Sequence, residues 1–122
     1  MIPIKQKNIH NPEKGIIGDC LRACICSLLE IDDTDVYNFA EDKNYPMELI
    51  KFLKNRGYRM RYSKIEPKDI VKYYMVWGES PRGLNHSVIY SDGKLVHDPH
   101  PYGGGVIPDM YAWLEKRKMF ND

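Results

Sequence analysis

The hydrophobic pattern of this chain changes its period at Gly57. Before this glycine, apolar residues recur at helical spacing over residues 19–30 and 46–56. After it, alternating runs rich in tyrosine, valine and tryptophan predict strands at 58–62 and 73–77. Helices that precede the strands, instead of alternating with them, predict an α+β fold in which N-terminal helices pack on a small antiparallel sheet.

The remaining elements are predicted from turn residues and local spacing. They are a short helix at 32–40 capped by Asp33 or Thr34, a helical turn at 67–70, strands at 87–90 and 94–98 around the Asp92-Gly93 turn, and an amphipathic helix at 109–118. In the last of these, Met110, Trp113 and Leu114 stand at i, i+3 and i+4, which is typical of one helix face.

Size and charge limit the functions that the chain can have. Its 122 residues fit one domain spanning 1–122, and 18 basic against 17 acidic residues leave a net charge of +1. This balance disfavours binding to duplex nucleic acid. The aromatic residues of the strands are interpreted as sheet packing instead of base-stacking platforms, namely Tyr58, Tyr62, Tyr73, Tyr74 and Trp77. No apolar run approaches the ~20 residues of a membrane span.

The cysteines and the first residues predict the compartment. Three cysteines crowd into the seven positions 20–26, which makes a poor disulfide framework. The segment 1–6 has neither the apolar stretch nor the small-residue cleavage site of a signal peptide. We therefore expect a cytoplasmic protein with reduced thiols.

Cys20 begins the predicted helix at 19–30, directly after Asp19 as its candidate N-cap. The unpaired N–H groups at a helix start favour a thiolate, which is the nucleophilic form of cysteine. Asp19 opposes this effect unless its side chain turns back to cap the helix. Cys20 is a candidate nucleophile, although a cysteine at a helix start is more often a small core residue.

His86 and Asp98 lie on the two predicted strands of the hairpin. If 91–93 form a three-residue loop, His86 faces Asp98 with the two Cβ atoms ~4.5–5.5 Å apart. A two-residue Asp92-Gly93 turn shifts the register by one and places Asp98 on the opposite face. Both turns suit the sequence, so a Cys20-His86-Asp98 triad depends on which of them forms.

Thiol hydrolysis of an amide also needs hydrogen-bond donors for the oxyanion. The backbone N–H of Cys20 is one candidate. A second is expected from an amide side chain upstream, and Gln6 is the single glutamine of the chain, with Asn8 and Asn11 as alternatives.

Other side chains are candidates for a substrate rim or a metal site. Arg82, His97, His100 and Gly104 of the glycine run could hold a phosphate or carboxylate, although loops also need glycine simply to turn. The residues that could bind zinc, Cys20, Cys24, Cys26, His86, His97 and His100, match none of the common ligand spacings. We therefore expect no metal and no cofactor.

These residues resemble the papain-like cysteine peptidase fold, nearest to small C39-like peptidase proteins of bacteria and their viruses. The matching stretches are 2–6, 18–24, 80–83, 86–90 and 97–101. The resemblance implies Cys20 as nucleophile, His86 as base, Asp98 as orienter and Gln6 in the oxyanion hole. Gln6 lies fourteen residues before Cys20, whereas C39-like peptidases usually keep the glutamine a few residues before the cysteine.

Two main hypotheses follow, with a zinc-stapled structural protein as a third. The first is a thiol hydrolase, or an acyltransferase with the same site, that acts on a peptide or a small amide-containing substrate. The second is a catalytically silent protein of the same fold that sequesters a small phosphorylated ligand or blocks a host protein. The oligomeric state is left open by the sequence.

Overall fold

The structure of the chain is a computed structural model that describes residues 1–32 and 36–118. Within these ranges it contains two α-helices and five strands. They are α1 (Cys20–Leu29), α2 (Met47–Asn55), β1 (Tyr58–Ser63), β2 (Tyr74–Glu79), β3 (Asn85–Ser91), β4 (Lys94–His97) and β5 (Ile107–Lys116), with short 3₁₀ helices at Pro12–Lys14 and Phe39–Glu41. The α+β class predicted from the sequence is confirmed.

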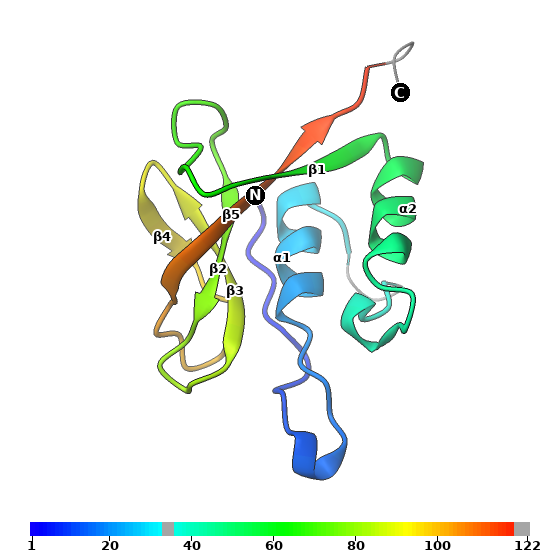
Figure 1. Cartoon of the computed structure of the whole chain (residues 1–122), viewed down its shortest axis with the longest axis vertical. Helices are drawn as coiled ribbons and strands as arrows, with labels where there is room; N and C mark the ends of the chain where they lie inside the picture. Colours follow the sequence, from blue (N-terminus) through cyan, green and yellow to red (C-terminus); the bar gives the residue numbers. More distant parts are fainter. Residues whose placement is uncertain (33–35, 119–122) are drawn as a thin grey trace.

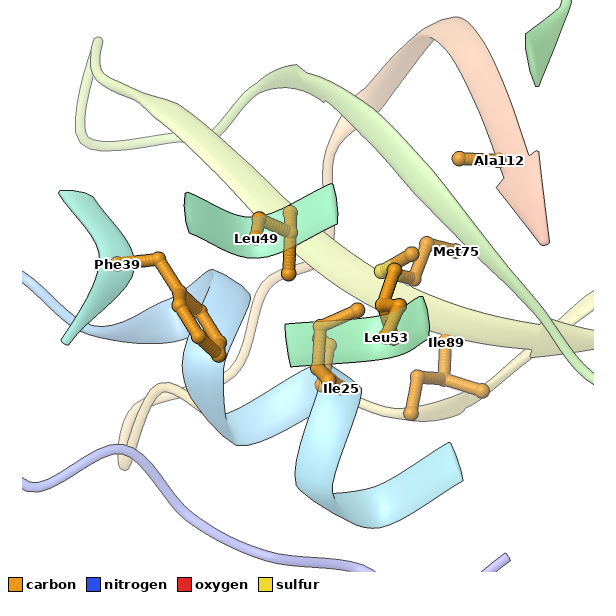
Figure 2. Packing of buried hydrophobic residues seen from close by; sticks show 8 residues of the cluster. Ile25, Phe39, Leu49, Leu53, Met75, Ile89 and Ala112 are labelled. Atoms are coloured by element: carbon orange, nitrogen blue, oxygen red, sulfur yellow. The ribbon is translucent and has the colours of Figure 1, made fainter. Parts of the chain in front are cut away.

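The strands form one antiparallel sheet in the order β1-β5-β2-β3-β4. Both helices lie on one side of this sheet, where α1 contacts β3 and α2 contacts β1 (Figure 1). The main core lies between these layers, and Figure 2 shows side chains from both helices and the sheet meeting there. Its fully or nearly fully buried members are Cys24, Ile25, Phe39, Leu49, Leu53, Met75, Ile89 and Ala112.

The prediction of a C-terminal helix at 109–118 is wrong, because residues 109–116 belong to the interior strand β5. Ala112 and Leu114 pack on the helix side, whereas Tyr111 and Trp113 pack in a smaller cluster around Tyr74 on the other face. A strand that has apolar neighbours on both faces does not show a clean alternation of apolar and polar residues. Pairing with both β1 and β2 decided between strand and helix.

The helices α1 and α2 confirm the predictions for 19–30 and 46–56, with their bounds shifted by one residue at each end. Of the predicted helix at 32–40, Asp33 and Thr34 lie outside the described residues. Residues 36–38 are not helical, so the rest of that prediction is wrong. A 3₁₀ turn begins only after Asn38, whose side chain accepts a hydrogen bond from the Ala40 N–H.

The N-terminal segment runs extended along α1 toward the end of β4. The N–H of Ile2 donates to the Ser27 carbonyl oxygen at 3.1 Å, and that of Ile4 donates to the Ser27 hydroxyl at 2.9 Å. Further along, the Gln6 N–H donates to the Pro99 carbonyl oxygen at 3.0 Å. These bonds bring Gln6 to the same end of the molecule as the start of α1. No helix in the described ranges is long and apolar enough to cross a membrane.

Candidate active site

The β3–β4 turn is the two-residue alternative. Ser91 pairs with Lys94, and Asp92 and Gly93 both have positive φ angles, of 51° and 77°. Two left-handed residues in succession are typical of the type I′ turn of a tight hairpin. With this turn alone, Asp98 would lie on the face of the hairpin opposite to His86.

A β-bulge reverses that consequence. The pairing passes from Tyr90 with Leu95 directly to Ile89 with His97, so Val96 is an extra residue in β4. One additional residue exchanges the two faces for everything beyond it, which returns Asp98 to the face of His86. The His86 Nε2 atom lies 2.7 Å from Asp98 Oδ1.

Backbone donors hold the Asp98 carboxylate in place. Oδ1 accepts from the His100 N–H and Oδ2 from the Gly105 N–H, each at 2.9 Å. Burial alone would raise the pKa of Asp98, but the hydrogen bonds from His86, His100 and Gly105 lower it to about 2. The carboxylate is therefore charged at neutral pH and fixes the orientation of the His86 ring. Gly105 has a φ of +66°, a conformation that favours glycine.

Cys20 is the first residue of α1, and Asp19 is the residue at its N-cap. The Asp19 carboxylate does not cap the helix in this structure. It accepts from the backbone N–H groups of Lys7 and Asn8, at 3.0 and 2.8 Å, and forms a buried ion pair with Arg22. Arg22 compensates the charge of Asp19, which weakens the effect on Cys20 that the sequence led us to expect.

The His86 ring lies between Asp98 and Cys20. Burial alone would lower its pKa, but hydrogen bonds to Asp98 and Cys20, with the charges of both, raise it from 6.5 to about 9. Because Nε2 is engaged by Asp98, Nδ1 is the nitrogen left to face the sulfur. A protonated ring beside a thiol favours the thiolate. His86 is thus joined to Asp98 by a hydrogen bond and lines the same two cavities as Cys20, so the groups that a thiol nucleophile needs lie in one region.

Gln6 reaches the same site from the N-terminal segment. Its Nε2 donates to the Asn8 carbonyl oxygen at 2.7 Å, which uses one of its two hydrogens. Its Oε1 is buried and has no hydrogen-bond partner among the described residues. Gln6 lines a cavity together with Cys20 and His86.

Two cavities meet at Cys20, Asn85 and His86. The first, which we call the aromatic cavity, has a volume of about 500 Å³ and includes Leu21, Tyr45, Tyr62, Trp77 and Met110 in its lining. The second, the polar cavity, has a volume of about 640 Å³ and includes Gln6, His10, Ser80, Arg82 and His100. Both volumes are in the range of small-molecule sites.

Several lining residues escaped the sequence analysis. Tyr62 and Trp77 do pack against each other, with ring centroids 5.5 Å apart, but they also line the aromatic cavity. Trp77 pairs with Ser87, the neighbour of His86, so the register of β2 against β3 was the signal that could have placed it at the site. Such a register depends on long-range pairing that no local pattern specifies.

Two of the candidate rim residues lie in the polar cavity. Arg82 donates from Nη1 to the Gly103 carbonyl oxygen at 2.9 Å. The ring of His100 is 6.0 Å from that of His86, centroid to centroid. Burial, with the nearby charges of Arg82 and His86, lowers the pKa of His100, so this ring is neutral at pH 7.

The other two rim candidates lie elsewhere. The Nε2 atom of His97 is 2.7 Å from the Ile4 carbonyl oxygen, so this buried ring holds the N-terminal segment and lines neither cavity. Gly104 lies against Pro81 and lines a separate small hollow with it. The structure does not bring His97 and Gly104 to Cys20.

No group of three or more His, Cys, Asp or Glu side chains in residues 1–32 and 36–118 is placed to hold a metal ion. Cys24 instead donates from Sγ to the Ser87 carbonyl oxygen at 3.4 Å, and Cys26 is fully buried. The zinc hypothesis has no support in this part of the chain.

Compared with known proteins, the chain matches no family model, no curated sequence and no solved structure.

Proposed function

We propose that this protein is a thiol hydrolase of the papain-like type that cleaves an amide or peptide bond. The observation that carries the proposal is the grouping of Cys20, His86 and Asp98 at the meeting point of two cavities. Each side chain has the setting that its role requires: a half-exposed sulfur at a helix start, a buried ring, and a fixed carboxylate.

In the resting site the proton lies on the His86 ring and the Cys20 sulfur is a thiolate, so the reaction starts from this ion pair. The thiolate attacks the carbonyl carbon of the amide and forms a carbon–sulfur bond, and the carbonyl oxygen takes the negative charge. When the carbon–nitrogen bond breaks, His86 donates its proton to the leaving amine. His86 then removes a proton from water, which attacks the thioester and releases the acid and the free thiol.

Two groups are available to stabilise the oxyanion. The backbone N–H of Cys20 belongs to the first turn of α1, where N–H groups have no acceptor within the helix. The second hydrogen on Gln6 Nε2 supplies the other donor. Removal of a single oxyanion donor typically costs about 10²–10³-fold in kcat.

The position of the triad also favours a substrate that extends in two directions. Because cavities open on both sides of Cys20 and His86, groups on either side of the scissile bond can be bound. A substrate held on both sides keeps its carbonyl near the sulfur, which is how binding contributes to the rate. A peptide or an acylated small amine fits this arrangement.

The test is the rate of alkylation of Cys20 by iodoacetamide near pH 6, followed by intact-mass and peptide mass spectrometry. Cys24 and Cys26 are fully buried, so they are poor comparators, and N-acetylcysteine in the same solution serves as the reference thiol. We expect Cys20 to react at least about tenfold faster than the reference, because free thiols are almost wholly protonated at this pH.

His86→Gln is the matched variant, since it keeps a polar side chain but removes the base. We expect this variant to lower the alkylation rate of Cys20 to that of the reference thiol or below. Equal rates for the wild type and His86→Gln would contradict the proposal. They would favour the silent binding protein, in which the cavities bind a ligand without chemistry at sulfur.

A further inference from the structure

The polar cavity is lined by side chains that present hydrogen-bond donors. His10 Nδ1 accepts from the Gly18 N–H at 3.2 Å, and His100 Nδ1 accepts from the Tyr102 N–H at 3.0 Å. A neutral ring that accepts at Nδ1 carries its hydrogen on Nε2. Both rings are therefore fixed in the tautomer that donates from Nε2, and both line the cavity.

Arg82 adds further donors. It gives one hydrogen bond to Gly103, and a guanidinium has five N–H groups. Lys5 adds positive charge nearby, because its Nζ donates to the carbonyl oxygens of Asp98 and His100, at 3.0 and 3.4 Å.

The lining of the polar cavity, in the described part of the chain, includes neither aspartate nor glutamate. The aromatic cavity differs, because Asp109 lines it and is paired with Lys64 at 3.0 Å. Donors and positive charge without a carboxylate favour an oxyanion, whereas aromatic rings beside an acid disfavour one. The two sides of Cys20 are therefore chemically distinct.

We propose that the polar cavity binds an anionic oxygen group of the substrate, a carboxylate or a phosphate-type group, next to the scissile amide. The apolar part of the same substrate then occupies the aromatic cavity, and the amide lies across Cys20. The substrate class is a small or terminal amide with an anionic group at one end and an apolar group at the other. This inference rests on the proposed function, because it assigns the two ends of its substrate.

The experiment uses three matched ligands: N-benzoylglycine, its phosphonate analogue N-benzoylaminomethylphosphonate, and its neutral amide N-benzoylglycinamide. Binding to the Cys20→Ser variant is measured by isothermal titration calorimetry and by NMR at about 0.15 M salt, where distant surface charges are screened. The serine prevents turnover of the ligands. We expect at least one anion to bind about tenfold or more tightly than the amide, because hydrogen bonds to charged groups are the strong ones.

The comparison between the two anions identifies the source. Tighter binding of the carboxylate indicates a peptide or acyl amino acid terminus, and tighter binding of the phosphonate indicates a phosphorylated substrate. Arg82→Met, in the same background, is expected to remove most of the preference for an anion. His10→Ala is a second variant, and both side chains are exposed, so neither change opens the core.

Lys94→Met is the matched control. It removes the same charge at the turn of the β3–β4 hairpin, where Lys94 pairs with Ser91, the residue five positions after His86 in β3. This change should leave the preference for an anion unchanged. Equal affinity for all three ligands, no binding by any of them, or a preference that survives both Arg82→Met and His10→Ala would overturn the inference. Binding of an anion through Arg82 with an unreactive Cys20 would instead contradict only the hydrolase proposal.

Discussion

The first and second turns of α1 carry the same side chain in opposite surroundings. Cys20 and Cys24 stand four residues apart, so they share one helix face, which contacts β3. Cys20 is half-exposed, lines both cavities and lies beside the His86 ring. Cys24 is fully buried and donates to a backbone carbonyl oxygen, and burial raises its pKa well above the usual value.

Under the proposed function, the partner of each thiol decides its reactivity and the helix face that the two thiols share does not. One strand, β3, offers Cys20 an imidazole that can accept its proton and offers Cys24 the carbonyl oxygen of the next residue, Ser87. Burial keeps the proton on the Cys24 sulfur, because a thiolate there would be charged without solvent. We therefore expect chemistry at the first turn of α1, whereas the second turn packs in the core.

The largest expected effect is on hydrolysis. Cys20→Ser should reduce the cleavage of a mixed peptide library, measured by mass spectrometry of new termini, by about 10³-fold or more, since loss of a nucleophile disables the whole triad. Cys24→Ala should keep most of the activity. If both variants cleave as the wild type does, the contrast between the two cysteines has no catalytic meaning.

The next largest effect is expected at the carboxylate. Asp98→Asn removes the charge that orients the His86 ring and favours its protonated form, so the rate of hydrolysis should fall by about 10²–10⁴-fold. The same change should lower the pKa of His86 from about 9 toward its ordinary value of 6.5, which NMR titration of the ring measures. A rate loss without a shift of this pKa would indicate that Asp98 only shapes the loop.

A smaller effect is expected from the core cysteine. Cys24→Ala leaves a small void and removes the bond to Ser87, so the free energy of unfolding should fall by about 1–2 kcal/mol. Urea denaturation measures this loss. The alkylation rate of Cys20 in the same variant serves as the control and should be unchanged, whereas a change in both would show that the two turns are coupled.

The smallest effect is the pH dependence of stability. The raised pKa of His86 means that its contribution to the free energy of unfolding is full below pH 6.5 and is lost as the pH rises through about 9. The lowered pKa of Asp98 means that its contribution is present above pH 3.8 and is lost as the pH falls through about 2. Both contributions to stability are therefore full between pH 3.8 and pH 6.5.

Urea denaturation from pH 6 to pH 9.5 checks the His86 part of this prediction. The wild type should lose more stability over this range than His86→Gln, because the variant lacks the titrating ring. Parallel curves for the two proteins would mean that the ring gains nothing from Asp98 and Cys20 in the folded state.

The C-terminal segment shows why part of the fold could not be predicted from the sequence. Met110, Trp113 and Leu114 fit a helical face, yet the segment forms an interior strand whose two faces contact two different clusters. The spacing was compatible with both structures. The choice depended on β1 and β2, which pair with the two edges of β5 and so hold it as a strand.

The hairpin shows the same limit at the site itself. The Asp92-Gly93 pair predicted a turn, and the sequence allowed either loop length. The two-residue turn formed, and the bulge at Val96 then returned Asp98 to the face of His86. The local sequence of β4 did not predict that bulge, because the packing of the strands fixes its position.

By itself, the sequence determined the pieces: a helix that begins at Cys20, a turn at Asp92-Gly93, and strands before and after it. Local propensity and capping are encoded by neighbours in the chain, so they can be recognised there. Long-range packing settled three further points: β5 is a strand, two cavities meet at Cys20, and His86 lies against Asp98. These outcomes depend on strand register and on burial between distant segments, for which the chain carries no local signal.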